Sequence, residues 1–263
     1  MTAIRPPAVA GLFYPAAPET LRFQVCAYLA AAAPATTETP PKALIVPHAG
    51  YPYSGPIAAS AYALLAQRAD TIRRVVLLGP AHRWFVPGMA YPQSSALATP
   101  LGTVPIDRDA LAYIAHLPQV QALDAAFTDE HCLEVQLPFL QIVLSDFRLV
   151  PLLVGAADTE NVAAVLAALW GEEETLILIS SDLSHYLDYT TAQHLDARTS
   201  QAILALRPEA IAPDQACGAR PIAGLLREAQ RRGLRARLLD LRNSGDTAGP
   251  RDRVVGYGAY AFA

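Results

Sequence analysis

The segment KALIVPHAGY (residues 42–51) is a short apolar run that leads directly into a histidine. Three segments share this design: KALIVPHAGY, RRVVLLGPAH (residues 73–82) and TLILISSDLSHY (residues 175–186). The runs predict strands buried on both faces of a parallel sheet. They place His48, His82, Asp182 and His185 just beyond strand ends. Because the carboxyl ends of parallel strands open into one crevice, we expect these side chains to converge.

Strands and helices alternate through the rest of the chain. The pattern predicts strands at residues 43–46, 75–78, 149–154, 175–180, 235–244 and 253–262, and helices starting near Pro18 and spanning 56–67, 107–117, 129–147, 160–170, 192–206 and 220–233. The sequence of residues 83–107 predicts an irregular hairpin or lid, and that of residues 34–41 predicts a Pro/Thr-rich loop. This alternation predicts one α/β domain over residues 1–263, with three αβα layers and a mostly parallel central sheet.

The composition excludes several classes of protein. With 52% hydrophobic and 17% charged residues, the 263-residue chain can fill a globular core. Its net charge of −4 predicts no nucleic-acid partner. Pro or charged residues interrupt every apolar run, so we expect no membrane span. The first residues lack the apolar core of a secretion signal, which favours a cytoplasmic location.

The three cysteines are too few and too scattered for a disulfide framework, and no CxxC pair is present. A buried thiol is the default interpretation for each. Cys217 has a second one, because it precedes the start of an expected helix and lies near Arg220, an environment that favours a thiolate. On its own this pattern does not choose between the two.

The two strand-end histidines form the strongest candidate site. A single histidine at such a position is more often a hydrogen-bonding or capping residue. Two at equivalent positions favour metal binding, because neutral imidazole is the commonest metal ligand in proteins. We therefore predict that His48 and His82 bind a metal ion.

Two acidic segments supply further candidates. In SSDLSHY, helical spacing would put Asp182 and His185 on one face, either as a cap and a surface residue or as a carboxylate and a general base. In DEHCLEVQ, Glu130, His131 and Glu134 would lie within one helical turn, as a solvated helix start or as support for the site. The HExxH motif of zinc proteases is absent, and so are GxGxxG, GxxxxGK[ST] and GxSxG.

Together these motifs resemble the Memo family, known in bacteria and archaea as protein B of the AmmeMemoRadiSam system. The segments that carry the resemblance appear in the family's order: RPPAVAGLFYP, VPHAGYPYSG, LLGPAHR, TPLGTVPID, DEHCLEVQLPF, SSDLSHY, ACGARPI and SGDTAGPRDRVVGYGAYAF. Any one of them is a loose match, but eight in sequence are specific.

The resemblance implies a fold and a set of site residues. The fold is that of LigB-type class III extradiol dioxygenases. The metal ligands would be His48, His82 and Cys217. Asp182 and His185 would line the pocket as catalytic residues, with His185 as the acid/base group, and Glu130 and His131 would face the same crevice.

A cysteine at the third position departs from the dioxygenases, which hold Fe(II) with two histidines and a carboxylate. A thiolate is softer, so Fe(II) or copper is expected and zinc is a further candidate. Activity does not transfer with the fold, because function depends on the site.

Three functions follow as hypotheses. The first is a metal-dependent redox enzyme, dioxygenase-like, that acts on a small and aromatic substrate. The second is a non-catalytic module that binds an anion or a phosphotyrosine peptide in the same pocket. The third is a zinc-dependent hydrolase that uses a metal-bound water. The usual genomic neighbours of the family also imply a functional link to a radical-SAM protein and an AMMECR-type protein.

Overall fold

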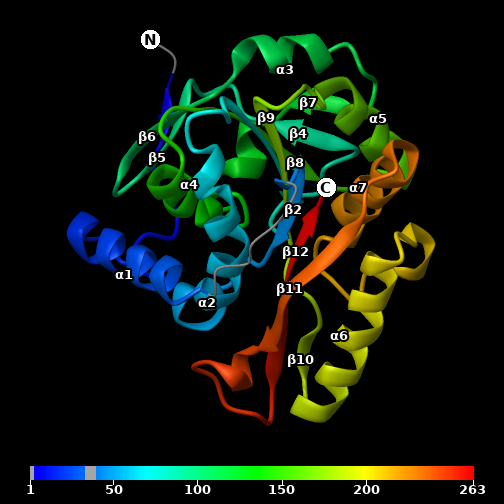
Figure 1. The fold of residues 1–263 in the computed structure, drawn as a ribbon. Helices are drawn as coiled ribbons and strands as arrows, with labels where there is room; N and C mark the ends of the chain where they lie inside the picture. The colour runs from blue at the N-terminus through cyan, green and yellow to red at the C-terminus, as the bar shows by residue number, and fades with distance from the viewer. Residues whose placement is uncertain (1–2, 33–39) are drawn as a thin grey trace.

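The computed structural model describes residues 3–32 and 40–263. The expected loop at residues 34–41 therefore lies largely outside the described part of the chain. The described residues form a mixed central sheet with helices on both faces (Figure 1). Their buried apolar side chains form one continuous cluster around that sheet.

The sheet is parallel at its centre and antiparallel towards both sides. In spatial order it consists of β10 (His185–Leu187), β12 (Val254–Phe262), β2 (Ala43–Val46), β9 (Thr175–Ser180), β3 (Arg74–Pro80), β8 (Arg148–Val154), β4 (Met89–Tyr91) and β7 (Val120–Ala122), and β11 (Ala236–Asn243) also pairs with β12. The four strands from β2 to β8 run parallel, whereas β10, β11 and β12 pair antiparallel and β4 runs antiparallel to β8. The predicted α/β class is confirmed, and the sheet is mixed.

Helices cover both faces of the central sheet. They are α1 (Pro18–Ala31), α2 (Tyr51–Tyr62), α3 (Arg108–Ile114), α4 (Leu137–Val143), α5 (Thr159–Leu169), α6 (Tyr189–Leu204) and α7 (Ala219–Arg232). Figure 1 shows α1, α2 and α4 on one side of the sheet and α5, α6 and α7 on the other. Short 3-10 turns link several of these elements.

A small second sheet lies in the region expected to form a hairpin or lid. It contains β1 (Ile4–Arg5), β5 (Ala96–Thr99) and β6 (Gly102–Pro105), and β5 and β6 form the hairpin. The N-terminal strand β1 joins β5 in parallel. This pairing brings the beginning of the chain next to the middle of the sequence.

Two expected helices and one expected helical turn differ in the structure. Helix α2 begins at Tyr51 rather than Pro56, because Pro52 occupies its first turn and the Tyr51 amide donates to the Phe13 carbonyl. Helix α4 begins at Leu137, so Pro138 lies in the first turn, where its missing N–H costs no hydrogen bond. The chain from Asp182 to His185 is extended and enters strand β10, so these two residues are not one helical turn apart.

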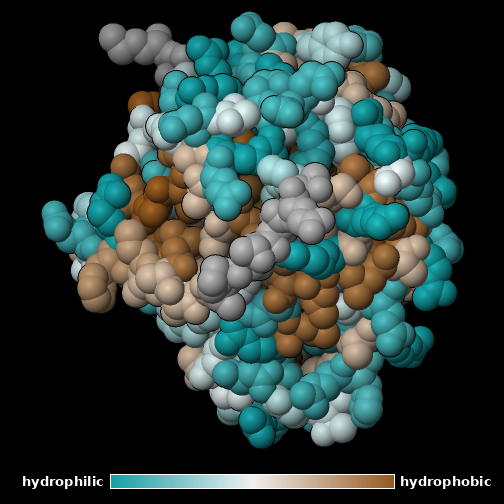
Figure 2. All heavy atoms as spheres, in the orientation of Figure 1, coloured by the Kyte–Doolittle hydropathy of each residue, from teal (hydrophilic) through white to brown (hydrophobic). Residues whose placement is uncertain are grey.

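Hydrophilic residues occupy most of the face shown in Figure 2, and apolar residues lie in patches between them. Within the described ranges, no helix is long and apolar enough to cross a membrane.

Candidate metal centre and cavity

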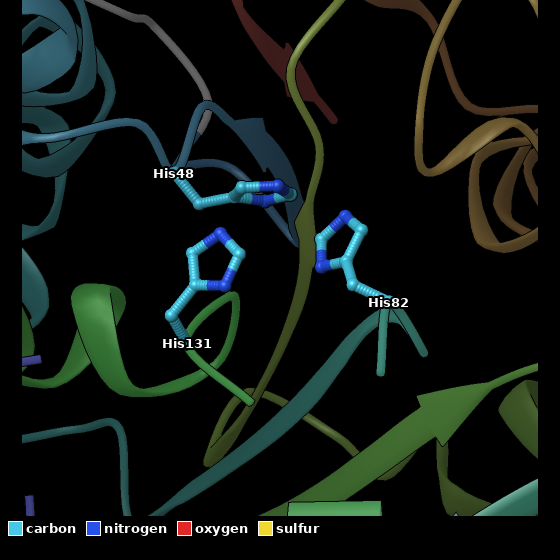
Figure 3. A group of neighbouring side chains, drawn as sticks. All are labelled: His48, His82 and His131. Carbon is cyan, nitrogen blue, oxygen red and sulfur yellow. The ribbon is translucent and has the colours of Figure 1, made fainter. Parts of the chain in front are cut away.

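Three histidines converge beyond the carboxyl ends of the central strands (Figure 3). His48 follows β2, His82 follows β3, and His131 lies in the turn before α4. One ring nitrogen from each lies within 4.8 Å of the others. The rings of His82 and His131 stack with centroids 4.9 Å apart, and His48 stands edge-on to both. This group could hold a metal ion.

The convergence follows from strand order. Strands β2, β9 and β3 are neighbours and parallel, with Val46 opposite Ser180 and Leu78 opposite Ile179. Their ends therefore open at one edge of the sheet. The expectation that His48, His82 and Asp182 lie together at that edge agrees with this arrangement.

A buried hydrogen-bond network fixes the tautomer of His48. The Ser180 hydroxyl donates its single proton to the Cys132 carbonyl at 2.6 Å, and it accepts from Gln136 Nε2 at 2.8 Å. It can therefore only accept from His48 Nδ1, which lies 2.9 Å away. The proton of His48 is thus on Nδ1, and the lone pair is on Nε2.

The orientation of the Gln136 amide in this network is itself determined. Its Nε2 donates to the Pro47 carbonyl at 2.9 Å, while its Oε1 accepts from the Tyr62 hydroxyl at 2.7 Å. Rotating the amide by half a turn would place Gln136 Oε1 against the Pro47 carbonyl oxygen, and two acceptors would then face each other. A chain of donors from Tyr62 through Gln136 to Ser180 therefore leaves His48 Nε2 free to bind a metal ion.

Glu130 orients the ring of His82 in the same way. Its Oε1 lies 2.9 Å from His82 Nδ1, and its Oε2 accepts from the His82 amide at 2.7 Å. Burial acts to raise the pKa of Glu130, but these contacts and the Cys132 amide outweigh it and hold the pKa at about 2. The carboxylate can only accept, so Nδ1 of His82 donates to it, and Nε2 is the ring nitrogen left to face the site.

Burial also keeps two of the imidazoles neutral. It lowers the pKa of His48 to about 3 and the pKa of His131 to about 4, with neighbouring histidines adding to the effect. Both rings are therefore uncharged at neutral pH. Neutral rings are the form that binds metals.

Asp182 and Cys217 both contact His48. Asp182 Oδ1 accepts from the His48 amide at 2.7 Å, and burial raises the pKa of this carboxyl. The Asp182 amide in turn donates to Cys217 Sγ at 3.3 Å. Asp182 therefore ties the loop that carries His48 to the loop that carries Cys217.

Cys217 contacts the free nitrogen of His48. Its Sγ lies 3.3 Å from Nε2, and burial raises the pKa of the thiol to about 12. The thiol is thus protonated at neutral pH and donates to Nε2 in the metal-free protein. Gly218 permits this placement, because a Cβ there would come within 2.6 Å of Ser181. Among the described residues, the three side chains whose nitrogens lie close enough together to hold a metal ion are those of His48, His82 and His131. Cys217, the third ligand that the family resemblance implies, is not in this group.

The site opens into a cavity of about 570 Å³. Its lining includes all three clustered histidines, together with Asp182 and His185. His185 starts strand β10, which pairs with β12. The cavity therefore contains five of the seven residues that the sequence nominates, and the other two, Glu130 and Cys217, lie beside the ring nitrogens of its histidines.

The acidic segment has a different geometry from the expected helical turn. Residues 128–133 form turns, and Glu134 begins a short 3-10 segment. Glu130 faces His82, whereas Glu134 accepts from Arg5 and Tyr14 at 2.7 and 2.6 Å. Glu134 therefore anchors the N-terminal segment, and Phe13 of that segment packs its ring 4.7 Å from His131.

Sequence reasoning missed Ser180, Gln136 and Phe13. Ser180 and Gln136 are buried polar residues that hydrogen-bond to each other although they lie 44 residues apart in the chain. No local pattern indicates such a pair. The only signal in the sequence is that Ser180 and Gln136 lie in SSDLSHY and DEHCLEVQ, two segments that each contain a candidate histidine.

Comparison with known proteins gives a consistent assignment. The model of the Memo-like protein family matches residues 5–261. MEMO1 family proteins from Archaeoglobus fulgidus and Ignicoccus hospitalis are 37% and 36% identical over 98% of this chain and cover 99% and 98% of their own lengths. The MEMO1 family protein of Aquifex aeolicus is 35% identical over 97% of both chains.

A solved structure of an uncharacterized protein from Escherichia coli K12 shares the fold, with a TM-score of 0.51 at 15% identity. The match covers 82% of this chain and 98% of that one. At this identity the likeness concerns the fold alone. The sequence matches extend over nearly the whole chain and confirm the resemblance seen in the motifs, so this protein belongs to the Memo-like family.

Proposed function

We propose that this protein is a metal-dependent oxidoreductase that acts on a small aromatic substrate in the cavity beside His48, His82 and His131. The observation that carries the proposal is the approach of three imidazole nitrogens to within 4.8 Å of one another. Two of these rings have their tautomers set by buried acceptors, which points lone pairs rather than protons at the site.

His48 and His82 would be the constant ligands, because their Nδ1 atoms are engaged and their Nε2 atoms are free. Two neighbours of His48 can complete the set. His131 would give an all-nitrogen centre, and Cys217, whose Sγ lies 3.3 Å from His48 Nε2, would give the mixed centre that the family resemblance implies. A bound iron or copper ion would supply redox chemistry.

The groups available for proton transfer lie in the same cavity. His185 lines it, and Asp182 lines it while holding the His48 amide. We propose that His185 is the acid/base residue and that Asp182 positions the His48 loop. Phe13 and the rim of the cavity would keep water away from the site.

The LigB-type fold belongs to this proposal. Its support is the parallel core of the sheet and the position of the histidines beyond the ends of adjacent strands, which is where ligands bind in open α/β sheets.

A zinc-dependent hydrolase is the second candidate, favoured by the neutral state of His48 and His131. Three neutral imidazoles and one open position form a known catalytic zinc site. In that case the bound metal would activate water rather than exchange electrons.

Metal substitution combined with oxygen uptake separates these functions. Purified protein would be stripped, reloaded with Fe(II), Cu or Zn, and assayed with a panel of phenols and catechols. We expect substrate-dependent oxygen uptake with iron or copper, absent in His48→Ala. It should be retained in His116→Ala, which removes an exposed histidine just after helix α3 and outside the cavity. Hydrolysis of model esters with zinc, without oxygen uptake with any metal, would contradict the oxidoreductase proposal.

Cobalt(II) loading identifies the third ligand. A thiolate bound to cobalt gives an intense near-ultraviolet band that imidazoles do not. The band is expected if Cys217 binds the metal, and Cys217→Ala then removes it. A centre completed by His131 lacks the band in the parent protein.

A further inference from the structure

Two arginines line the same cavity as the three histidines. Arg83 directly follows His82, and Arg253 lies just before strand β12. Across residues 3–32 and 40–263, neither guanidinium has a carboxylate within ion-pairing distance or a hydrogen bond to the protein. Their donors are therefore available to a ligand.

The acidic groups around the cavity do not neutralise these cations. Asp182 is the single carboxylate among the lining residues, and it accepts from the His48 amide at the buried end. Glu130 lies behind His82 and is engaged by His82 and by the amides of His131 and Cys132. The opening of the cavity thus carries an excess of positive charge.

Arg253 is held in place by an unusual residue. Its guanidinium carbon lies 4.7 Å from the centroid of the Tyr186 ring, a cation–π contact. Tyr186 has φ 60°, in the left-handed region that favours glycine, and it sits where the pairing of β10 with β12 shifts register. A tyrosine kept in a conformation that suits glycine indicates that the side chain is needed there.

The remaining walls suit a ring. Phe13, Tyr53 and Tyr257 line the cavity along with Tyr186. A volume of about 570 Å³ is that of a small-molecule site. The cavity therefore combines aromatic walls, free guanidinium donors and three clustered imidazoles.

We infer that the ligand of this cavity is a small aromatic acid, with its ring between the aromatic walls and its anionic group bound by Arg253. Arg83, which follows strand β3 and lines the same cavity, adds to the attraction. The inference rests on the proposed function, because it names the substrate class of that same site. Tyr186 is a positioning residue that orients Arg253.

Calorimetric titration with a charged and an uncharged ligand of the same shape tests the inference. The full chain would be titrated with 4-hydroxybenzoate, 4-hydroxybenzamide and phenyl phosphate, with and without bound metal. At least one of the two anions is expected to bind about tenfold more tightly than the amide, as for a charge-assisted hydrogen bond. Arg253→Gln should remove this preference.

Arg251→Gln is the matched control. Arg251 lies in the same loop and stacks on Tyr189, with its guanidinium carbon 4.4 Å from that ring, but it does not line the cavity. It should keep the preference for the anion. Equal binding of acid and amide by the parent protein, or equal losses in the two variants, would overturn the inference.

Metal analysis of the same samples separates this inference from the proposed function. Arg253→Gln is expected to keep the parent's metal content. An anion preference in a protein that binds no metal would sustain the inference and defeat the proposed function. A phosphotyrosyl peptide that bound far more tightly than phenyl phosphate would overturn the assignment to a small molecule.

Discussion

The hydroxyl of Ser180 determines which nitrogen of His48 can bind a metal. Its proton goes to the Cys132 carbonyl, so its lone pairs face Gln136 and His48. The hydroxyl is fully buried. A single buried oxygen thereby sets the protonation pattern of His48.

Ser180→Ala should weaken metal binding by about tenfold to a hundredfold, because His48 loses the acceptor that fixes its tautomer. Metal affinity, measured by competition with a chelator, checks this. Ser200→Ala removes another buried serine hydroxyl, on α6, and should leave the affinity unchanged. Equal affinities of Ser180→Ala and the parent would contradict the role of Ser180.

At the scale of elements, helix α6 supports the strand that carries His185. Asp196 of α6 is buried, and its Oδ1 accepts from the Ser184 amide at 3.0 Å, next to His185. Gly256 of β12 makes room for this carboxyl, because a Cβ there would come within 1.9 Å of Asp196 Oδ2. The contact joins α6, β10 and β12 at one point.

Burial raises the pKa of Asp196 from 3.8 to about 6. Between these values the folded protein holds a proton that the unfolded chain has released, so stability falls as pH rises. The loss is on the order of 3 kcal/mol between about pH 4 and pH 6. The variant Asp196→Asn stays neutral at every pH, so it should not show this loss of stability.

Urea unfolding of both proteins between pH 4 and pH 8 measures this difference. The Asn variant is expected to match the parent near pH 4 and to exceed it above pH 6. A difference between the two proteins that does not change with pH would refute the linkage. Because Asn can still accept from the Ser184 amide, the comparison isolates the charge.

At the scale of the whole molecule, the N-terminal segment is tied to the site by Glu134. This buried carboxylate accepts from Arg5, from the amides of Ala8 and Val9, and from the Tyr14 hydroxyl. Arg5 also donates to the Glu130 carbonyl at 2.6 Å. The start of the chain thus holds both the turn behind His82 and the wall beside His131.

Glu134→Gln should destabilise the fold by about 3 kcal/mol, because the largely buried Arg5 loses its ionic partner. Hydrogen exchange should accelerate at the amides of Ala8 and Val9. Asp240→Asn, which breaks the more exposed pair with Arg242, should cost less than about 1 kcal/mol. Similar costs for the two variants would show that Glu134 is not an anchor.

The sequence predicts those features of this molecule that depend on local pattern. The strand Ala43–Val46 and the strand Thr175–Ser180 have the expected bounds, because the first apolar run ends at Pro47 and the second at Ser180. The turn at residues 128–133 was not predictable, since its backbone is held by Glu130 and by Arg5, which lies far away in the chain. Long-range contacts there override helical spacing.

Elemental analysis of anaerobically purified protein shows whether the clustered histidines bind one metal ion. We expect about one metal ion per chain in the parent and in His116→Ala, and a severe loss in both His48→Ala and His82→Ala, with circular dichroism confirming that the variants are folded. Equal metal content in the parent, His48→Ala and His82→Ala would show that these histidines do not bind the metal.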